Sequence, residues 1–244
     1  MRRHFVVLMA AFGGVRGNLP ALDAVLAAID NAGIHTIANA GDSVLGYPWP
    51  NEVLVRLQSR RMHSVQGELD RLVVRARRKA DSLRERIDPV LMDAATWTHR
   101  VTLSSNLEFL GTLPRRIVYS VEGLSVCLCH GSPCSQSERL GPGDDDSRFR
   151  RQREYANVHV VIMGGGSEPF SRIVDGTLFV NPGIAGRGEG NVSTACYAVI
   201  STETSPWSAE FHHIPYETDS LKEQLASRGL DRPWSLPDDV PPAD

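Results

Sequence analysis

The sequence of 244 residues predicts an α/β fold, a four-layer αββα sandwich of two mixed β-sheets flanked by helices. An opening strand–helix–strand pattern indicates a parallel pair of strands. A series of strands late in the chain indicates mostly antiparallel pairing. The composition, 41% hydrophobic and 23% charged, is typical of a globular chain that buries a full core without disulfides or a structural metal.

The opening part of the chain supplies the parallel unit. Residues 5–11 (FVVLMAA) form a short apolar run, which predicts a buried strand. After a glycine-rich turn, Asn18 can cap a helix that carries Pro20 in its first turn. Residues 35–42 (HTIANAGD) predict the second strand, which ends in an aspartate.

The middle of the chain is predicted to be mainly helical. Residues 51–60 and 70–87 predict helices, residues 62–70 (MHSVQGELD) a short strand and turn, and residues 88–113 short helices and loops. Three arginines of the second helix are expected to form a solvated face with their acidic neighbours: Arg71, Arg75 and Arg78.

The rest of the chain is predicted to be rich in strands. Residues 115–131 predict a hairpin with its turn at Glu122-Gly123 and a second strand that delivers His130. A helix is expected to begin near Ser147. Further strands are expected in VHVVIM (158–163), TLFVNPG (177–183), TACYAVIST (194–202) and AEFHHIPYE (209–217), and a last helix in residues 219–230.

The chain shows no internal repeat and no Pro- or Gly-rich linker in its middle. Residues 1–231 are therefore predicted to form one domain, and residues 232–244, with four prolines, a tail that trails over the surface. The net charge of -3 does not attract nucleic acid or an anionic membrane, and no segment has the roughly 18 apolar residues of a membrane span.

The N-terminal residues 1–15 combine basic residues with an apolar run, as a signal peptide does. They lack a clear small-x-small cleavage site, so a first core strand and a cytoplasmic location are favoured. Cys127-x-Cys129-His130-x3-Cys134 matches the spacing of no common zinc module. Two of these cysteines fall in an apolar strand, so buried thiols are favoured over a zinc site.

Six polar or glycine-rich turns follow apolar strands. Ligands of open α/β sheets bind at the carboxyl ends of strands, so these turns are expected to converge on one site. The turns are GGVRGN (13–18), GDSVLGYPWPNE (41–52), QGELD (66–70), CHGSP (129–133), GGGSEPF (164–170) and NPGIAG (181–186).

The order and spacing of these turns resemble those of the calcineurin-like metallophosphoesterases. The likeness is greatest to a small bacterial branch of phosphodiesterases and diadenosine-tetraphosphatase-like proteins. That family carries D-x-H-G-N-L, G-D-x-x-G-Y, G-N-H-[DE], H-G-S-P, G-H-x-H-x-P-F and N-P-G-S-x-G in this order. The resemblance covers residues 5 to 230, roughly, and implies the αββα sandwich and a two-metal phosphoesterase reaction.

This chain departs from the family at several site positions. Residues that are aspartate or histidine in the family are here Gly14, Arg16, Leu69, Gly165 and Ser167, and the serine after N-P-G is Ile184. The resemblance assigns one ion to positions 14, 16, 42 and 167, of which only Asp42 is a ligand, so that ion is expected to be absent.

The resemblance assigns the other ion to positions 42, 68, 130 and 165. Asp42, Glu68 and His130 remain there, with Glu68 in place of an asparagine. Three ligands and water can hold one divalent ion, such as Mn, Fe, Ni or Zn. The favoured interpretation is instead that Asp42 and His130 hydrogen-bond neighbouring backbone. No efficient two-metal phosphoesterase activity is predicted, because charge neutralisation and acid–base help are both lost.

A pocket that binds without turnover remains a prediction of the same turns. Arg16 lies among glycines just before a helix N-terminus, and with Asn18, Gly164 and Gly165 it is predicted to form an anion cradle. The alternative is that Arg16 points to solvent. A dinucleotide-binding fold is disfavoured, since Gly13-Gly14-x-x-Gly17 does not match G-x-G-x-x-G.

Three functions are therefore carried forward. The first is a pseudoenzyme that binds a phosphate-containing small molecule, such as a nucleotide, or a protein partner. The second is a residual single-metal phosphoesterase that uses Asp42, Glu68 and His130. The third is an interaction module without a small ligand. Neither nucleic acid nor a membrane is expected as a partner.

Overall fold

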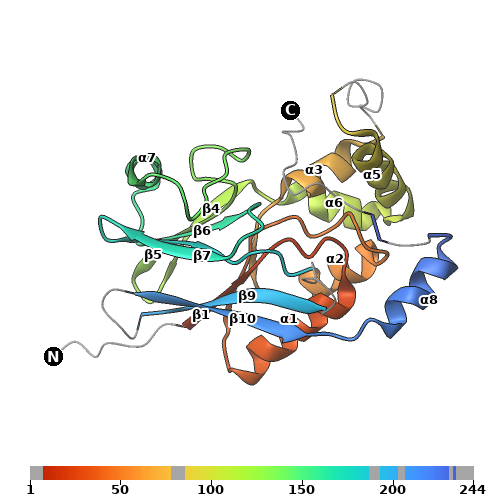
Figure 1. Cartoon of the computed structure of the whole chain (residues 1–244), viewed down its shortest axis with the longest axis horizontal. Helices are drawn as coiled ribbons and strands as arrows, with labels where there is room; N and C mark the ends of the chain where they lie inside the picture. Colours follow the sequence, from red (N-terminus) through yellow and green to blue (C-terminus); the bar gives the residue numbers. More distant parts are fainter. Residues whose placement is uncertain (1–7, 78–85, 187–192, 203–206, 231–232, 235–244) are drawn as a thin grey trace.

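The computed structural model describes residues 8–77, 86–186, 193–202, 207–230 and 233–234. Within them, two five-stranded mixed sheets pack face to face and helices lie outside them (Figure 1). The strand orders are β10-β9-β1-β2-β3 and β4-β5-β6-β8-β7. This architecture confirms the predicted αββα sandwich. None of the described helices is both long and apolar enough to span a bilayer.

The first sheet contains the predicted parallel unit. Strand β1 (Leu8–Phe12) pairs in parallel with β2 (Thr36–Asn39), and β2 with the two-residue β3 (His63–Ser64). The late strands β9 (Thr194–Ser201) and β10 (Ser208–Pro215) add to the other edge of β1 in antiparallel order. The first and last parts of the chain are thus joined in one sheet.

The second sheet is built around the predicted hairpin of β4 (Arg116–Val121) and β5 (Leu124–His130). Strand β6 (Val160–Gly164) is parallel to β5, and β8 (Thr177–Asn181) is parallel to β6. The edge strand β7 (Phe170–Val174) is missing from the sequence prediction. Only its ends are buried, so it lacks the long buried run of β5, β6 and β8.

Three apolar layers hold the sandwich together. Alternate residues of the strands point between the sheets, where Met9 and Ala11 meet Leu128 and Ile162. Helix α1 (Leu19–Asn31) covers the outer face of the first sheet, and the predicted cap is confirmed because the Asn18 side chain accepts a hydrogen bond from the N–H of Ala21.

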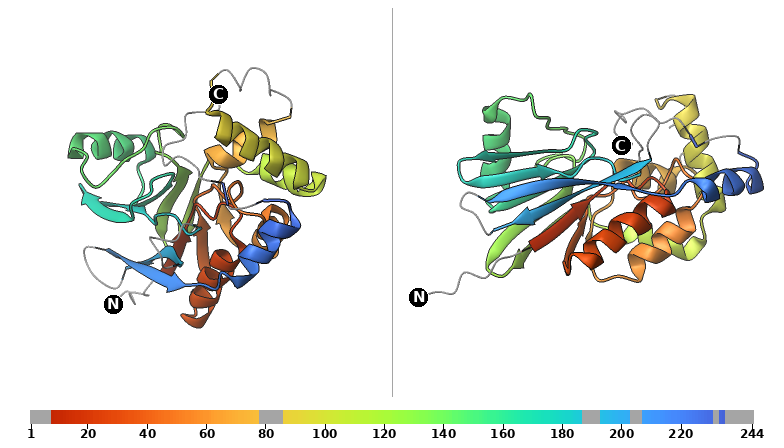
Figure 2. Two further views of the ribbon diagram at one scale, coloured as in Figure 1. Left: turned by 45° about the vertical axis from the view of Figure 1, so that its right-hand side comes forward. Right: turned by 60° about the horizontal axis from the view of Figure 1, so that its bottom comes forward.

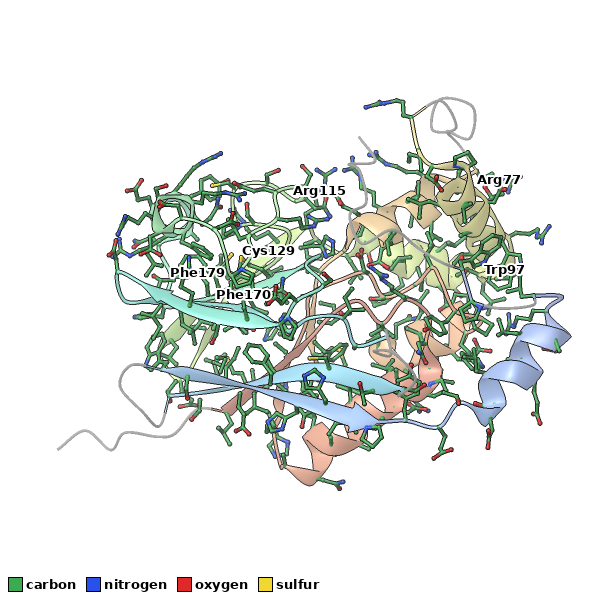
Figure 3. All side chains as sticks on the ribbon, viewed as in Figure 1. Arg77, Trp97, Arg115, Cys129, Phe170 and Phe179 are labelled. Atoms are coloured by element: carbon green, nitrogen blue, oxygen red, sulfur yellow. The ribbon has the colours of Figure 1, made fainter. Side chains whose placement is uncertain are left out.

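Helix α7 (Asp146–Ala156) covers the outer face of the second sheet. Its Phe149 ring meets Phe179 edge to face, with ring centroids 5.2 Å apart, and also contacts Phe170. Figure 3 labels Phe170 and Phe179 in the second sheet. Cys127 and Cys129 are buried in the same layer, which confirms the interpretation as buried thiols. No disulfide joins the cysteines, all of which lie in the described part of the chain.

Further helices gather at one end of the sandwich (Figure 2). We call α2 (Pro50–Gln58), α3 (Glu68–Arg75), α5 (Pro89–Val101) and α6 (Ser104–Thr112) the helical cluster, because their apolar faces share one core. Helix α8 (Asp219–Ser227) follows the last strand. The predicted tail lies mostly outside the described residues.

Two predictions about the start of α3 are wrong. The short strand expected in residues 62–70 is confirmed as β3, but the helix expected from residue 70 begins earlier, at Glu68, because the Asp70 carboxylate accepts the N–H of Gly67 in a capping interaction. Arg71 was expected on a solvated face, yet it is buried where the helix meets the strand ends. Arg78 lies outside the described residues.

Candidate functional site

The turns at the carboxyl ends of the strands meet, as the sequence predicts. The N–H of Gly14 donates to the Gly41 carbonyl at 2.8 Å, and the N–H of Arg16 donates to the Asp42 carbonyl at 2.9 Å. The N–H of Gly186 donates to the Gly14 carbonyl at 2.9 Å. These bonds tie together the turns after β1, β2 and β8. Arg16 and Asp42 both have φ of 55°, a strained conformation common at functional sites.

Glycine is required where these turns touch. A Cβ on Gly67 would lie 2.1 Å from Asp42 Oδ1, and a Cβ on Gly164 would lie 2.2 Å from the carbonyl oxygen of Ala40. Both glycines are shared with the family motifs. They allow the turns after β2, β3 and β6 to approach at backbone distance.

Asp42 and Asp70 are buried carboxylates that bind backbone N–H groups. Asp42 Oδ1 accepts from the N–H of Leu69 at 2.9 Å. Asp70 accepts from Ser43 and Val44 through one oxygen and from Gly67 through the other. Burial, reinforced by the charge of Asp42, raises the pKa of Asp70 to about 7, although the backbone donors oppose this shift. Through its three hydrogen bonds, Asp70 connects the turn after β2 to the start of α3.

His130 is held by the backbone at one ring nitrogen, and its other ring nitrogen makes no hydrogen bond within the described part of the chain. Its Nδ1 lies 2.8 Å from the carbonyl oxygen of Ala40 and must carry the proton, because a carbonyl only accepts. Burial lowers the pKa of His130 despite the nearby Asp42 charge, so the ring is neutral. Among the residues that the structure describes, its buried Nε2 has no hydrogen-bond partner, and it faces Asp42 Oδ2 at 3.5 Å.

At the position of the second ion, Glu68 is already bound to a cation. Its Oε2 lies 2.5 Å from Nη2 of Arg139, and its side chain is only 3% exposed. Arg139 also donates through Nε to the Gly165 carbonyl at 3.0 Å. A Cβ on Gly165 would lie 2.5 Å from that Nε. Arg139 therefore fills the space into which a side chain at position 165 would extend.

At the position of the first ion, another side chain fills the space of a lost ligand. Gly14 has φ of 62°, and a Cβ there would lie 3.0 Å from the Cγ2 methyl of Ile184. Arg16 is buried rather than directed to solvent, and Ser167 is exposed. Leu69, at the position of a family histidine, is fully buried in the core of the helical cluster. None of these four side chains is a metal ligand.

The residues do not fit the two divalent ions that the family fold implies. Among the residues that the structure describes, no group of three His, Cys, Asp or Glu side chains lies close enough to hold a metal. The predicted set of Asp42, Glu68 and His130 is therefore not assembled, because Glu68 turns to Arg139. Asp42 and His130 do make the backbone contacts that the favoured interpretation expected.

A cavity of about 280 Å³ opens beside this site. We call it the arginine-lined cavity, because Arg71, Arg115 and Arg116 line it together with His130, Glu68 and the turn of residues 132–137. In the view of Figure 3, Arg115 lies between the second sheet and the helical cluster. Arg116 is fixed by its bond to the Pro133 carbonyl at 3.0 Å and lies over the Tyr155 ring.

The predicted anion cradle is not part of this cavity. Arg16, Asn18, Gly164 and Gly165 are absent from its lining. The Asn18 amide donates to the Gly186 carbonyl at 2.9 Å and to the Tyr216 hydroxyl at 3.0 Å, so it joins α1 to two later segments. The cradle thus remains a prediction that no contact in the structure tests.

Sequence reasoning missed the four arginines that surround the site, Arg71, Arg115, Arg116 and Arg139. One signal was present in the sequence. An acidic Glu68 in place of a neutral ligand requires a counter-charge once it is buried, and a search for its partner leads to the arginines of the neighbouring turns.

Comparison with known proteins agrees with this architecture. The calcineurin-like phosphoesterase superfamily domain matches residues 9–205. An uncharacterized protein of Methanocaldococcus jannaschii, MJ0912, is 26% identical over 241 residues, covering 91% of this chain and 93% of its own.

Solved structures show the same fold. The hypothetical protein PH1004 from Pyrococcus horikoshii OT3 superposes with a TM-score of 0.80 at 19% identity, covering 92% of this chain and 94% of its own. A metallophosphoesterase from Sphaerobacter thermophilus gives 0.70 at 21% identity, with coverages of 93% and 95%. Because the family domain spans most of its length, this chain belongs to the calcineurin-like phosphoesterase superfamily.

Proposed function

We propose that this chain binds a phosphate-bearing small molecule in the arginine-lined cavity and does not hydrolyse phosphoesters efficiently. The observation that carries the proposal is the position of that cavity. Arg71, Arg115 and Arg116 line it, and His130 and Glu68, the remnants of the family's metal site, line it too. Under this proposal the chain retains phosphate binding but lacks the metal ions that hydrolysis in the family requires.

The charge of the lining favours an anion. The lining holds three arginines and a single carboxylate, that of Glu68, which also binds Arg139, so the cavity carries a net positive charge. Guanidinium groups bind phosphate oxygens through paired hydrogen bonds, which makes arginine well suited to phosphate recognition.

The size of the cavity restricts the ligand. Pockets for small molecules usually hold about 300–1,000 Å³, and this one, of about 280 Å³, lies at the lower end. It can enclose a phosphate group with a small attached group. The rest of a nucleotide would extend past Arg115 and Arg116, which are exposed.

Hydrolysis is opposed by the same residues. A two-metal site activates water and neutralises the phosphate in the transition state. Here Arg139 and Ile184 fill the space of two ligands, and Leu69 replaces a histidine. Losing general acid–base help alone costs about 10²–10⁴-fold in rate.

The test is a thermal-shift and calorimetry series with inorganic phosphate, AMP and ATP. We expect the melting temperature of the wild-type protein to rise, because a ligand of the folded state stabilises it. Arg115→Gln should weaken this shift, and Arg60→Gln, which changes a half-buried arginine paired with Asp30 outside the cavity lining, should not. No shift with any of the three anions, or equal shifts in all variants, would contradict anion binding and favour an interaction module.

The second candidate is a single-metal phosphoesterase that uses Asp42, Glu68 and His130. The favouring observation is the bare Nε2 of His130, which faces Asp42 Oδ2 at 3.5 Å. Two acceptors that face each other need a cation or proton between them. Metal analysis of purified protein separates the candidates: this one requires a bound ion in the wild-type protein that His130→Ala removes.

Other expectations stay predictions. They are a protein partner in place of the small molecule, a bacterial source, a cytoplasmic location, the single domain of residues 1–231, and the anion cradle of Arg16, Asn18, Gly164 and Gly165. The Asn18 contacts described above argue for a structural role of that side chain.

A further inference from the structure

The guanidinium of Arg139 is fixed on three sides. Nη2 binds the Glu68 carboxylate at 2.5 Å, Nε donates to the Gly165 carbonyl at 3.0 Å, and Nη1 donates to the Gln136 carbonyl at 2.6 Å. Its side chain is 21% exposed. Arg139 is therefore held inside the site rather than spread over the surface.

The guanidinium lies where two of the four positions of the second ion meet. Those positions are 42, 68, 130 and 165. Arg139 contacts the carboxylate of Glu68, and its Nε and Cζ would lie 2.5 and 2.7 Å from a Cβ on Gly165. A histidine at position 165 and this guanidinium cannot occupy the same space.

The charges at the site also favour a guanidinium in the position of the second ion. A buried carboxylate without a counter-charge is strongly destabilising, so Glu68 requires a cation. Arginine supplies one that stays protonated at all accessible pH. A divalent ion next to this guanidinium would be repelled by its positive charge and would overlap with its atoms.

We infer that Arg139 has taken the place of the second ion and keeps divalent metal out of the site. Arg139 binds the carboxylate that an ion would bind and fills the space of the missing ligand at position 165. The inference rests on the proposed absence of efficient hydrolysis. It is independent of the anion in the cavity, since its test measures metal and not phosphate.

The test is metal binding by variants of Arg139. Wild-type protein, Arg139→Ala, Arg139→Gln and Arg139→Ala/Gly165→His are equilibrated with Mn²⁺ or Zn²⁺, desalted and analysed for metal. We expect no bound ion in the wild-type protein. The variants should bind about one ion per chain, since Asp42, Glu68 and His130 become available together. Histidine tolerates the positive φ of 76° at position 165 better than most residues.

A matched control is Arg150→Ala. Arg150 lies on α7 and pairs with Asp146 and Asp175, so this variant removes a guanidinium without removing a contact of Glu68 or Arg139. This control variant should bind no ion. The second readout is the melting temperature, which metal should raise in the Arg139 variants and leave unchanged in the control.

Three results would overturn the inference. One is wild-type protein that binds as much metal as Arg139→Ala, a result that also supports the single-metal candidate. Another is a folded Arg139→Ala and a folded Arg139→Gln that bind none. The third is failure of both variants to fold even with metal, because an ion would then not replace the guanidinium. Loss of phosphate binding in Arg115→Gln is measured separately and bears on the proposed ligand alone.

Discussion

Glu68 and Arg139, 71 residues apart in the sequence, form an ion pair of 2.5 Å in the interior of the site. One partner begins α3 and the other lies in the turn before α7. The pair joins the helical cluster to the second sheet at the strand ends, where a metal would do so in a metallophosphoesterase. Its energetics give the first prediction.

Breaking this pair from one side should be costly. Arg139→Met removes the guanidinium that pairs with the buried Glu68 carboxylate, and we expect the free energy of unfolding to fall by about 3–5 kcal/mol. Glu68→Gln/Arg139→Met should recover part of that loss, because the buried carboxylate is removed together with the guanidinium that it binds. Urea denaturation of the wild-type protein, Arg139→Met, Glu68→Gln and the double variant measures the cycle. Strictly additive single effects would contradict the coupling. The exposed pair Arg56–Asp23 serves as a control, with a coupling of about 1 kcal/mol or less.

The close approach at Gly67 gives a second prediction. In Gly67→Ala the added methyl would lie 2.1 Å from Asp42 Oδ1 and 2.2 Å from the N atom of Asp42, so the turn after β2 must move. We expect a loss of about 2 kcal/mol or more in the free energy of unfolding. Gly143→Ala, where nothing lies within 4 Å of the new Cβ, should be nearly neutral. Equal melting temperatures of the two variants would show that the turns do not touch as described.

Asp70 should make stability depend on pH. Burial and the charge of Asp42 raise its pKa to about 7, above the value near 4 of an unfolded chain. The protonated form is therefore favoured in the folded state. Its contribution is complete below about pH 4 and is lost as the pH rises towards about 7. Denaturation of wild-type protein and Asp70→Asn across this range should show a difference that shifts against the wild-type protein as the pH rises. A constant difference would contradict the raised pKa.

Variants of Asn18 distinguish a structural role of this side chain from a role in ligand binding. Asn18→Ala removes the cap of α1 and the two bonds to Gly186 and Tyr216, and should cost about 1–2 kcal/mol. Asn18→Asp retains the cap acceptor and should recover part of this loss. Calorimetry with phosphate should give the same affinity for both variants as for the wild-type protein. A large loss of affinity in a folded variant would instead place Asn18 in the anion site.

The sequence predicts most of the fold because its local signals agree with its tertiary contacts. Asn18 caps α1, the turn at Glu122-Gly123 joins β4 and β5, and the glycine-rich turns meet at the strand ends. The sequence does not predict β7, because the burial of this strand depends on its neighbours in the sheet. The burial of Arg71 likewise depends on contacts between distant segments, which periodicity along one helix does not encode.

For the site itself, the sequence predicts only which metal ligands of the family are missing. The motifs show which ligands are missing at positions 14 and 165, but they do not show what fills the space. Ile184 fills the first position and Arg139 the second. Arg139 lies in a polar turn of the kind that usually covers a surface, so only the folded chain reveals its contact with Glu68.

The most direct measurement is anomalous scattering from wild-type crystals soaked in Mn²⁺. We predict no peak beside Asp42, Glu68 and His130, with the Arg139 guanidinium against Glu68. A manganese peak between these three side chains, with Arg139 displaced, would contradict the account.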